Sequence, residues 1–137
     1  MRDKKIWAQD SSNKAAHDIY SLYFIGWICG YLAFVIAFVW ASIKVYSPAV
    51  APLYKSHFRF QQSMAWQGLL VFLLSGVIWY FCYPLLSWQQ WWYALVLVVL
   101  TILLPLYWCI KRCIMGFNLL KNDQAVRNPY TFLYPKM

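Results

Sequence analysis

Apolar and polar residues along this chain are arranged in long blocks. Three apolar runs, at residues 19–43, 64–83 and 92–110, contain no acidic or basic residue. Each is about as long as the roughly 20 residues that a helix needs to cross the hydrocarbon of a bilayer. Backbone groups in lipid must bond internally, which favours helices. The pattern therefore predicts an all-α integral membrane protein with three transmembrane helices.

Polar segments flank and separate these runs. Residues 1–18 form a polar N-terminal tail, residues 19–120 the three-span membrane domain, and residues 121–137 a C-terminal surface tail. Pro48 and Pro52 exclude one continuous helix through the linker between the first two runs. Pro105 lies within the third run, so it should kink that helix or leave a carbonyl for a neighbour to satisfy.

The segment 52–66 is the longest polar interruption between apolar runs. At 100° per residue, Lys55, Arg59 and Gln62 fall on one side of a helix, and His57 falls on the opposite, aromatic side. This distribution is typical of an amphipathic helix at the membrane interface, here between the first and second spans. It predicts a surface for anionic lipid headgroups or a partner protein. The alternative is a basic loop that only fixes topology.

Two basic residues that follow the third run belong to the same predicted surface. The residues expected to bind a partner or lipid are Lys55, His57, Arg59, Gln62, Lys111 and Arg112. For His57 the two interpretations are a contact to a phosphate headgroup and an ordinary interfacial hydrogen bond.

Small residues form a stripe in the first run, at intervals of four, three, four and four. The stripe consists of Gly26, Gly30, Ala33, Ala37 and Ala41. Small side chains let helices approach closely in lipid, where the hydrophobic driving force between helices is absent. The stripe predicts helix packing, either within this chain or against a partner's helix.

Composition supports the membrane interpretation. Of 137 residues, 63% are hydrophobic and 12% are charged, about half the charged fraction of an ordinary soluble domain. The net charge is +8, and the bases flank apolar runs, so anionic headgroups explain them better than nucleic acid does. The four cysteines lie in or beside apolar runs without further ligands, so we expect neither a metal nor a cofactor.

Candidate catalytic chemistry is sparse. All four acidic residues are aspartates outside the apolar runs, and three spans would place His17 and His57 on opposite faces. An ion-coupled carrier needs an ionisable group in the membrane, and an enzyme needs an acid, base or nucleophile in a shared site. We therefore expect that the protein is not an enzyme.

The basic residues also predict an orientation. Three spans would place eight Lys or Arg residues on the side of segment 52–66 and the C-terminal tail, and four on the side of the N-terminal tail. The positive-inside rule then predicts an outside N-terminus and a cytoplasmic C-terminus.

Several short motifs resemble a known family. They are Lys55–Gln61 (KSHFRFQ) entering a Trp-containing span, Arg112–Gly116 after the third span, and the closing Asn128–Tyr130. This pattern resembles a widespread group of small bacterial membrane proteins of no agreed function, distantly similar to the channel-like component of the chloroplast inner-envelope protein translocon. The resemblance covers about Tyr20–Tyr130. Its most telling residues are Ser56, His57, Arg59, Gln61, Arg112, Gly116, Asn128 and Pro129.

The resemblance implies a bacterial inner-membrane protein whose cytoplasmic surface matters, and it points to translocation. Our first hypothesis is a non-enzymatic accessory subunit of a larger inner-membrane complex concerned with transport or secretion, with other membrane subunits as partners. One alternative is a self-assembling small pore or transporter, for which Gln67, Ser75 and Thr101 are the polar candidates. Another is a lipid-acting membrane enzyme, with His57 and Arg59 holding a phosphate.

Overall fold

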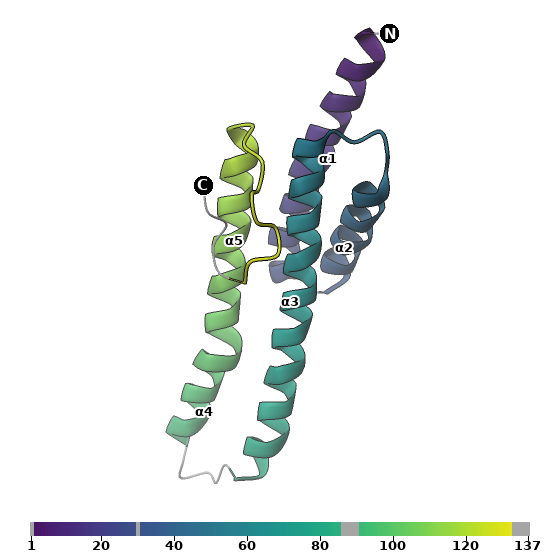
Figure 1. Ribbon diagram of the computed structural model, residues 1–137. Coiled ribbons are helices and arrows are strands. Elements are labelled where there is room, and N and C mark those ends of the chain that lie inside the picture. Colours follow the sequence, from purple (N-terminus) through teal and green to yellow (C-terminus); the bar gives the residue numbers. More distant parts are fainter. Residues whose placement is uncertain (1, 30, 86–90, 133–137) are drawn as a thin grey trace.

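The structure is a computed structural model that describes residues 2–29, 31–85 and 91–132 (Figure 1). Within these ranges all regular structure is helical. The elements are α1 (Arg2–Cys29), α2 (Tyr31–Tyr46), α3 (Pro52–Cys82), the short 3₁₀-helix η1 (Tyr83–Leu85), α4 (Trp91–Val98), the π-helical η3 (Val99–Leu103) and α5 (Leu104–Lys121).

Two helical rods are long and apolar enough to cross a membrane. They are α3 and the rod Trp91–Lys121 that α4, η3 and α5 form together. They lie side by side (Figure 1). The all-helical prediction is confirmed, and two of the three predicted spans correspond to these rods.

The first predicted span, residues 19–43, is not a single helix, which corrects our expectation of three crossings. A Cβ placed on Gly26 in α1 would lie 3.1 Å from the backbone nitrogen of Phe34 in α2. Eight residues within one helix would separate these positions by about 12 Å. The rings of Tyr23 and Phe34 also meet edge-to-face, with centroids 5.0 Å apart. The run therefore folds back as a helical hairpin of α1 and α2.

The hairpin changes which ends of the elements meet. The N-terminal end of α1, the α2–α3 connection and the end of α5 lie at one end of the molecule, and the end of α3 and the start of α4 lie at the other (Figure 1). Because α3 and the rod Trp91–Lys121 run in opposite directions, α5 ends at the same end of the molecule at which α3 begins (Figure 1). The predicted N-terminus outside and C-terminus inside required an odd number of crossings, so that orientation no longer follows.

Segment 52–66 is the first half of α3 and not a separate interfacial helix. Pro52 occupies the first turn, where its missing N–H costs no hydrogen bond, and the helix continues unbroken to Cys82. The face predicted to be apolar is indeed buried: it contains Tyr54, His57, Phe58, Phe60, Gln61 and Met64. It packs inside the protein against α1 and α5, however, and not against acyl chains.

The end of α5 determines where the chain turns back. The amide of Gln124 donates to the carbonyl of Leu119 (2.9 Å) and the amide of Asp123 to that of Leu120 (3.1 Å). Asp123 has φ 51°, the left-handed conformation of a Schellman cap. After this cap, the chain returns along the side of α5 that faces α3 (Figure 1).

Candidate functional site

The candidate functional site is a buried polar cluster between α1, α3, α5 and the returning chain. We define the polar cluster as Tyr20, His57, Gln61 and Arg112, none of which has exposed surface. Polar groups buried in this way are stabilised only by hydrogen bonds or equivalent contacts. Their partners therefore indicate what the cluster does.

His57 connects three parts of the chain. Its Nε2 donates to the carbonyl of Gln124 (2.9 Å), because a carbonyl oxygen only accepts. Its Nδ1 then accepts from the hydroxyl of Tyr20 (3.2 Å). Burial raises the pKa of Tyr20, so this hydroxyl stays neutral and keeps its proton. Both ring nitrogens of His57 are thus occupied by partners within the fold.

Gln61 joins α3 to α1. Its side-chain amide donates to the carbonyl of Ala16 (3.0 Å), and its main-chain carbonyl accepts from the hydroxyl of Tyr23 (3.0 Å). These bonds hold two helices whose backbone groups are otherwise paired within each helix. The polar residues at positions 57 and 61 therefore lie on the buried face because they bond to other elements.

Arg112 carries a charge into the interior without an ion pair to any residue in the described ranges. One guanidinium NH2 group, Nη1, donates to Oε1 of Gln67 and to the carbonyl of Phe132, the latter at 3.2 Å. The guanidinium carbon lies 4.7 Å from the ring centre of Phe60 and 4.9 Å from that of Trp108. Aromatic faces stabilise a desolvated cation. Among the described residues, Nε and Nη2 have no hydrogen-bond partner.

Gly116 is where α5 approaches α1 and α3 most closely. A Cβ at this position would meet the hydroxyl of Tyr20 and would lie 2.8 Å from Cε1 of Phe60. Real Cβ atoms are essentially never found at such distances. Glycine is therefore required here by space and not by backbone conformation.

The returning chain is held by side chains of α3 and α5. The hydroxyl of Ser56 accepts from the amide of Val126 (3.0 Å), and the hydroxyl of Ser63 donates to the carbonyl of Pro129. Further along, Gln67 Nε2 donates to the carbonyl of Tyr130 (3.2 Å). Trp108 Nε1 donates to the carbonyl of Phe132 (2.8 Å).

The predicted binding residues fall into two groups. His57 and Arg112 are buried in the cluster, whereas Arg59 and Lys111 are exposed and Lys55 and Gln62 are partly exposed. Gln62 donates to Ser42 (3.3 Å), and Lys111 lies along the side chain of Tyr107. The structure therefore does not unite these six residues on one surface. Only the outward-facing ones could contact a headgroup directly.

The predicted packing stripe is divided between two helices. Gly26 lies in α1 against Phe34, whereas Ala37 and Ala41 are fully buried in α2 and Ala33 is partly exposed. Gly30 lies outside the described residues. The described small residues pack mainly within the chain, where they let α1, α2 and α3 approach one another.

Pro105 lies just after the π-helical turn η3, in which the amide of Leu104 bonds to the carbonyl of Val99. The carbonyl of Thr101, in the same turn, accepts from the hydroxyl of Ser75 on α3 (3.2 Å). The Thr101 hydroxyl donates to the carbonyl of Leu97 (2.6 Å) and accepts from the indole N–H of Trp79 (2.9 Å). Ser75, Thr101 and Gln67, the candidate pore-lining residues, thus all bond within the fold.

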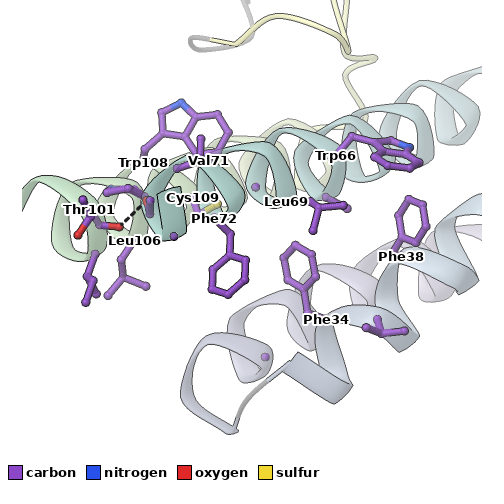
Figure 2. Close-up of a pocket in the computed structure, with 18 of the residues that line it drawn as sticks. Phe34, Phe38, Trp66, Leu69, Val71, Phe72, Thr101, Leu106, Trp108 and Cys109 are labelled. Atoms are coloured by element: carbon purple, nitrogen blue, oxygen red, sulfur yellow. Dashed lines mark hydrogen bonds between the residues drawn. The ribbon is translucent and has the colours of Figure 1, made fainter. Parts of the chain in front are cut away.

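A groove of about 620 Å³ lies beside this junction, between α2 and the two long helices. In Figure 2, Phe34 and Phe38 of α2 face Leu69 and Phe72 of α3 across it, and Trp66 closes one end. Its walls are almost entirely apolar. The groove therefore offers no obvious group for binding a polar substrate.

The described residues contain no cluster of three or more His, Cys, Asp or Glu side chains that could hold a metal ion. Cys82, Cys109 and Cys113 are free thiols, and the last two are buried.

Sequence reasoning missed the role of Tyr20, Tyr23 and Ser63. The available signal was the pair His57 and Gln61, polar residues four apart on an otherwise apolar face. Such a pair indicates buried partners, but it does not identify them.

No family model, curated protein or solved structure matches this chain. The resemblance stated from short motifs therefore stays a hypothesis. Three of the residues that carry it, Ser56, His57 and Arg112, bond to the returning chain.

Proposed function

We propose that this chain is a non-enzymatic subunit of a larger membrane complex, and that it contributes surfaces and not chemistry. The observation that carries the proposal is the way its polar groups are used. His57, Gln61 and Arg112 hold helices and the returning chain together, and Ser75 and Thr101 join the two long helices. The surfaces left for contact are apolar helix faces and a basic end.

The apolar faces are extensive. In the most apolar windows of α3 and of the rod Trp91–Lys121, only 6% and 11% of residues are buried. Exposed side chains follow both rods: Leu70, Leu73, Val77 and Phe81 on α3, and Leu95, Leu100 and Ile102 on the other rod. In a bilayer such faces are covered by lipid or by helices of other subunits.

The hairpin of α1 and α2 enters the membrane in this proposal without crossing it. A Cβ on Gly68 would lie 3.6 Å from the ring of Phe34 near the hairpin tip. Gly68 is about 24 Å along α3 from Pro52, and the whole helix is about 46 Å long. The tip therefore reaches about half-way along α3. The outer face of α2 is apolar, with Leu32 77% exposed and Ile43 64% exposed.

The two-crossing arrangement supports a new orientation. Every Lys and Arg of the sequence precedes residue 60 or follows residue 110, so the α3–α4 connection carries none. The positive-inside rule then favours a cytoplasmic location for both the start of α1 and the end of α5. Lys55 and Arg59, which point outward at this end, are our proposed contacts to anionic headgroups or a partner. A bacterial inner membrane, and a link to transport or secretion, rest on the motif resemblance alone.

The test is gentle extraction of the tagged protein from its native membrane, with native mass measurement and identification of every co-purifying chain. We expect a defined complex with larger membrane proteins. A homo-oligomer or monomer with no other chain bound would overturn the proposal. In that case, ion or solute flux in reconstituted vesicles would test the pore alternative.

A further inference from the structure

We infer that the face of α3 and α5 that holds the returning chain is a binding site for peptide main chain. The chain's own C-terminal segment, residues 122–132, is its resident occupant, and a segment of a partner subunit takes the same place by exchange. This inference rests on the proposed function, because it names where the partner docks.

The contacts are to backbone atoms of the occupant. Six side chains bond to main-chain groups of the C-terminal segment: Ser56, His57, Ser63, Gln67, Trp108 and Arg112. Main-chain groups are the same in every sequence apart from the missing N–H of proline. A different segment on the same path would therefore satisfy most of these partners.

The segment follows one face of α3. Ser63 and Gln67 lie 7 and 11 residues beyond Ser56, which places each of them within 20° of Ser56 around the helix. Ser56 and Gln67 are separated by about 16 Å along the helix axis. Their partners Val126 and Tyr130 follow in the same order along the segment, which turns at residues 128–131, where the amide of Thr131 donates to the carbonyl of Asn128 (3.4 Å). The segment therefore runs alongside α3 in the same direction, as Figure 1 shows.

Few side chains anchor the segment. Val126 is 3% exposed, but Gln124, Arg127 and Asn128 are exposed and Tyr130 is 65% exposed. Phe132 stacks on Trp108 with ring centroids 4.9 Å apart, yet half of its surface stays open. A segment with little buried apolar surface opens at low free-energy cost compared with the core.

The same contacts explain why exchange is favoured over simple release. His57 and Arg112 are fully buried, and loss of the segment would remove the carbonyls of Gln124 and Phe132 from them. Unpaired buried donors are unfavourable, so a replacement that supplies carbonyls is stabilised. The fitting occupant is a segment with a small aliphatic side chain, a turn and, six residues after the aliphatic side chain, an aromatic ring.

The test uses the full-length protein in lipid nanodiscs and hydrogen exchange of residues 122–132 followed by mass spectrometry. The probe is a synthetic peptide with the sequence of residues 122–132. Without peptide we expect slow hydrogen exchange at the Val126 amide, which bonds to Ser56. A saturating concentration of peptide should accelerate this exchange at least tenfold. A control peptide with alanine in place of the valine and the phenylalanine keeps the main-chain groups but loses both side-chain anchors, so it should act only at higher concentrations.

Two variants check that the site itself is responsible. Ser63→Ala removes a bond to the segment and should accelerate the hydrogen exchange of residues 122–132 in the absence of peptide. Ser21→Ala removes a bond within α1, to the carbonyl of His17, and should leave this hydrogen exchange unchanged. Hydrogen exchange that is unchanged by saturating peptide, or that is fast without peptide, would overturn the inference. The measurement needs no partner, so its outcome is separate from that of the co-purification experiment.

Discussion

At the residue scale, Gly116 and Gly76 form a natural contrast. Both lie within helices, but a Cβ on Gly116 would collide with Tyr20 and Phe60, whereas a Cβ on Gly76 would meet nothing within 4 Å. Tyr20 has little freedom to move, because its hydroxyl bonds to His57 in a fully buried position. The same residue type therefore serves packing at one position and has no packing role at the other.

This contrast predicts opposite effects of alanine. Gly116→Ala should lower the free energy of unfolding by about 1–2 kcal/mol, since overpacking costs about 1–3 kcal/mol and the gain in helix propensity returns at most about 1 kcal/mol. Gly76→Ala should be neutral or stabilising by up to about 1 kcal/mol. Unfolding of both variants in one detergent measures the difference. Equal shifts would show that the close approach at Gly116 does not constrain the protein.

At the element scale, the rod Trp91–Lys121 combines α-helical and π-helical turns around a proline. A regular α-helix would pair the carbonyl of Thr101 with an N–H at position 105, which proline lacks, and Ser75 of α3 donates to this carbonyl. The irregular turn η3 is thereby joined to α3 within the apolar part of the chain. A local defect in one helix becomes a contact between two helices.

A double-mutant cycle tests this compensation. Ser75→Ala should destabilise the protein by about 0.5–2 kcal/mol, because the carbonyl of Thr101 loses its donor in an apolar environment. In the Pro105→Ala background, residue 105 regains an N–H for that carbonyl, so the same substitution should cost much less. The measurement is unfolding of the four proteins in one detergent. An equal cost in both backgrounds would mean that Ser75 does not compensate for the proline.

At the scale of the whole molecule, the folded core lies at one end. The hairpin, the first half of α3, α5 and the C-terminal segment pack together there, and the far halves of the two long rods extend from it (Figure 1). This asymmetry matches the charge distribution, because the far halves of the two rods contain no Lys or Arg. In the proposed membrane arrangement, the packed end meets the cytoplasmic headgroups.

The arrangement predicts which positions share a side of the membrane. In a cysteine-free background, single cysteines at the exposed positions Lys14, Arg127 and Tyr83 should be labelled by a membrane-impermeant maleimide in sealed vesicles of known sidedness. Lys14→Cys and Arg127→Cys should react from the same side, and Tyr83→Cys from the other. Labelling of Lys14→Cys and Arg127→Cys from opposite sides would restore the three-crossing topology and contradict the hairpin.

Much of the fold follows from local properties of the sequence. The two long rods were predictable because a long uncharged apolar run has few alternatives to a helix. The compensation at Pro105 was predictable because a missing N–H always leaves an acceptor. The buried face of segment 52–66 was predictable from helical periodicity. What covers that face was not predictable, since apolar side chains are removed from water equally by lipid and by protein.

By itself, the sequence determined that the chain is helical, that it has apolar runs long enough to cross a membrane, and that its charged residues lie before residue 60 and after residue 110. These properties depend on residues within one or two helical turns of each other or on composition. Only the tertiary structure decided that residues 19–43 fold back as a hairpin, because a crossing helix and a hairpin have the same apolar periodicity. It also decided that His57 bonds to a carbonyl 67 residues away and that Arg112 holds the C-terminal segment. Such contacts depend on how distant elements close on each other, and no local pattern encodes that closure.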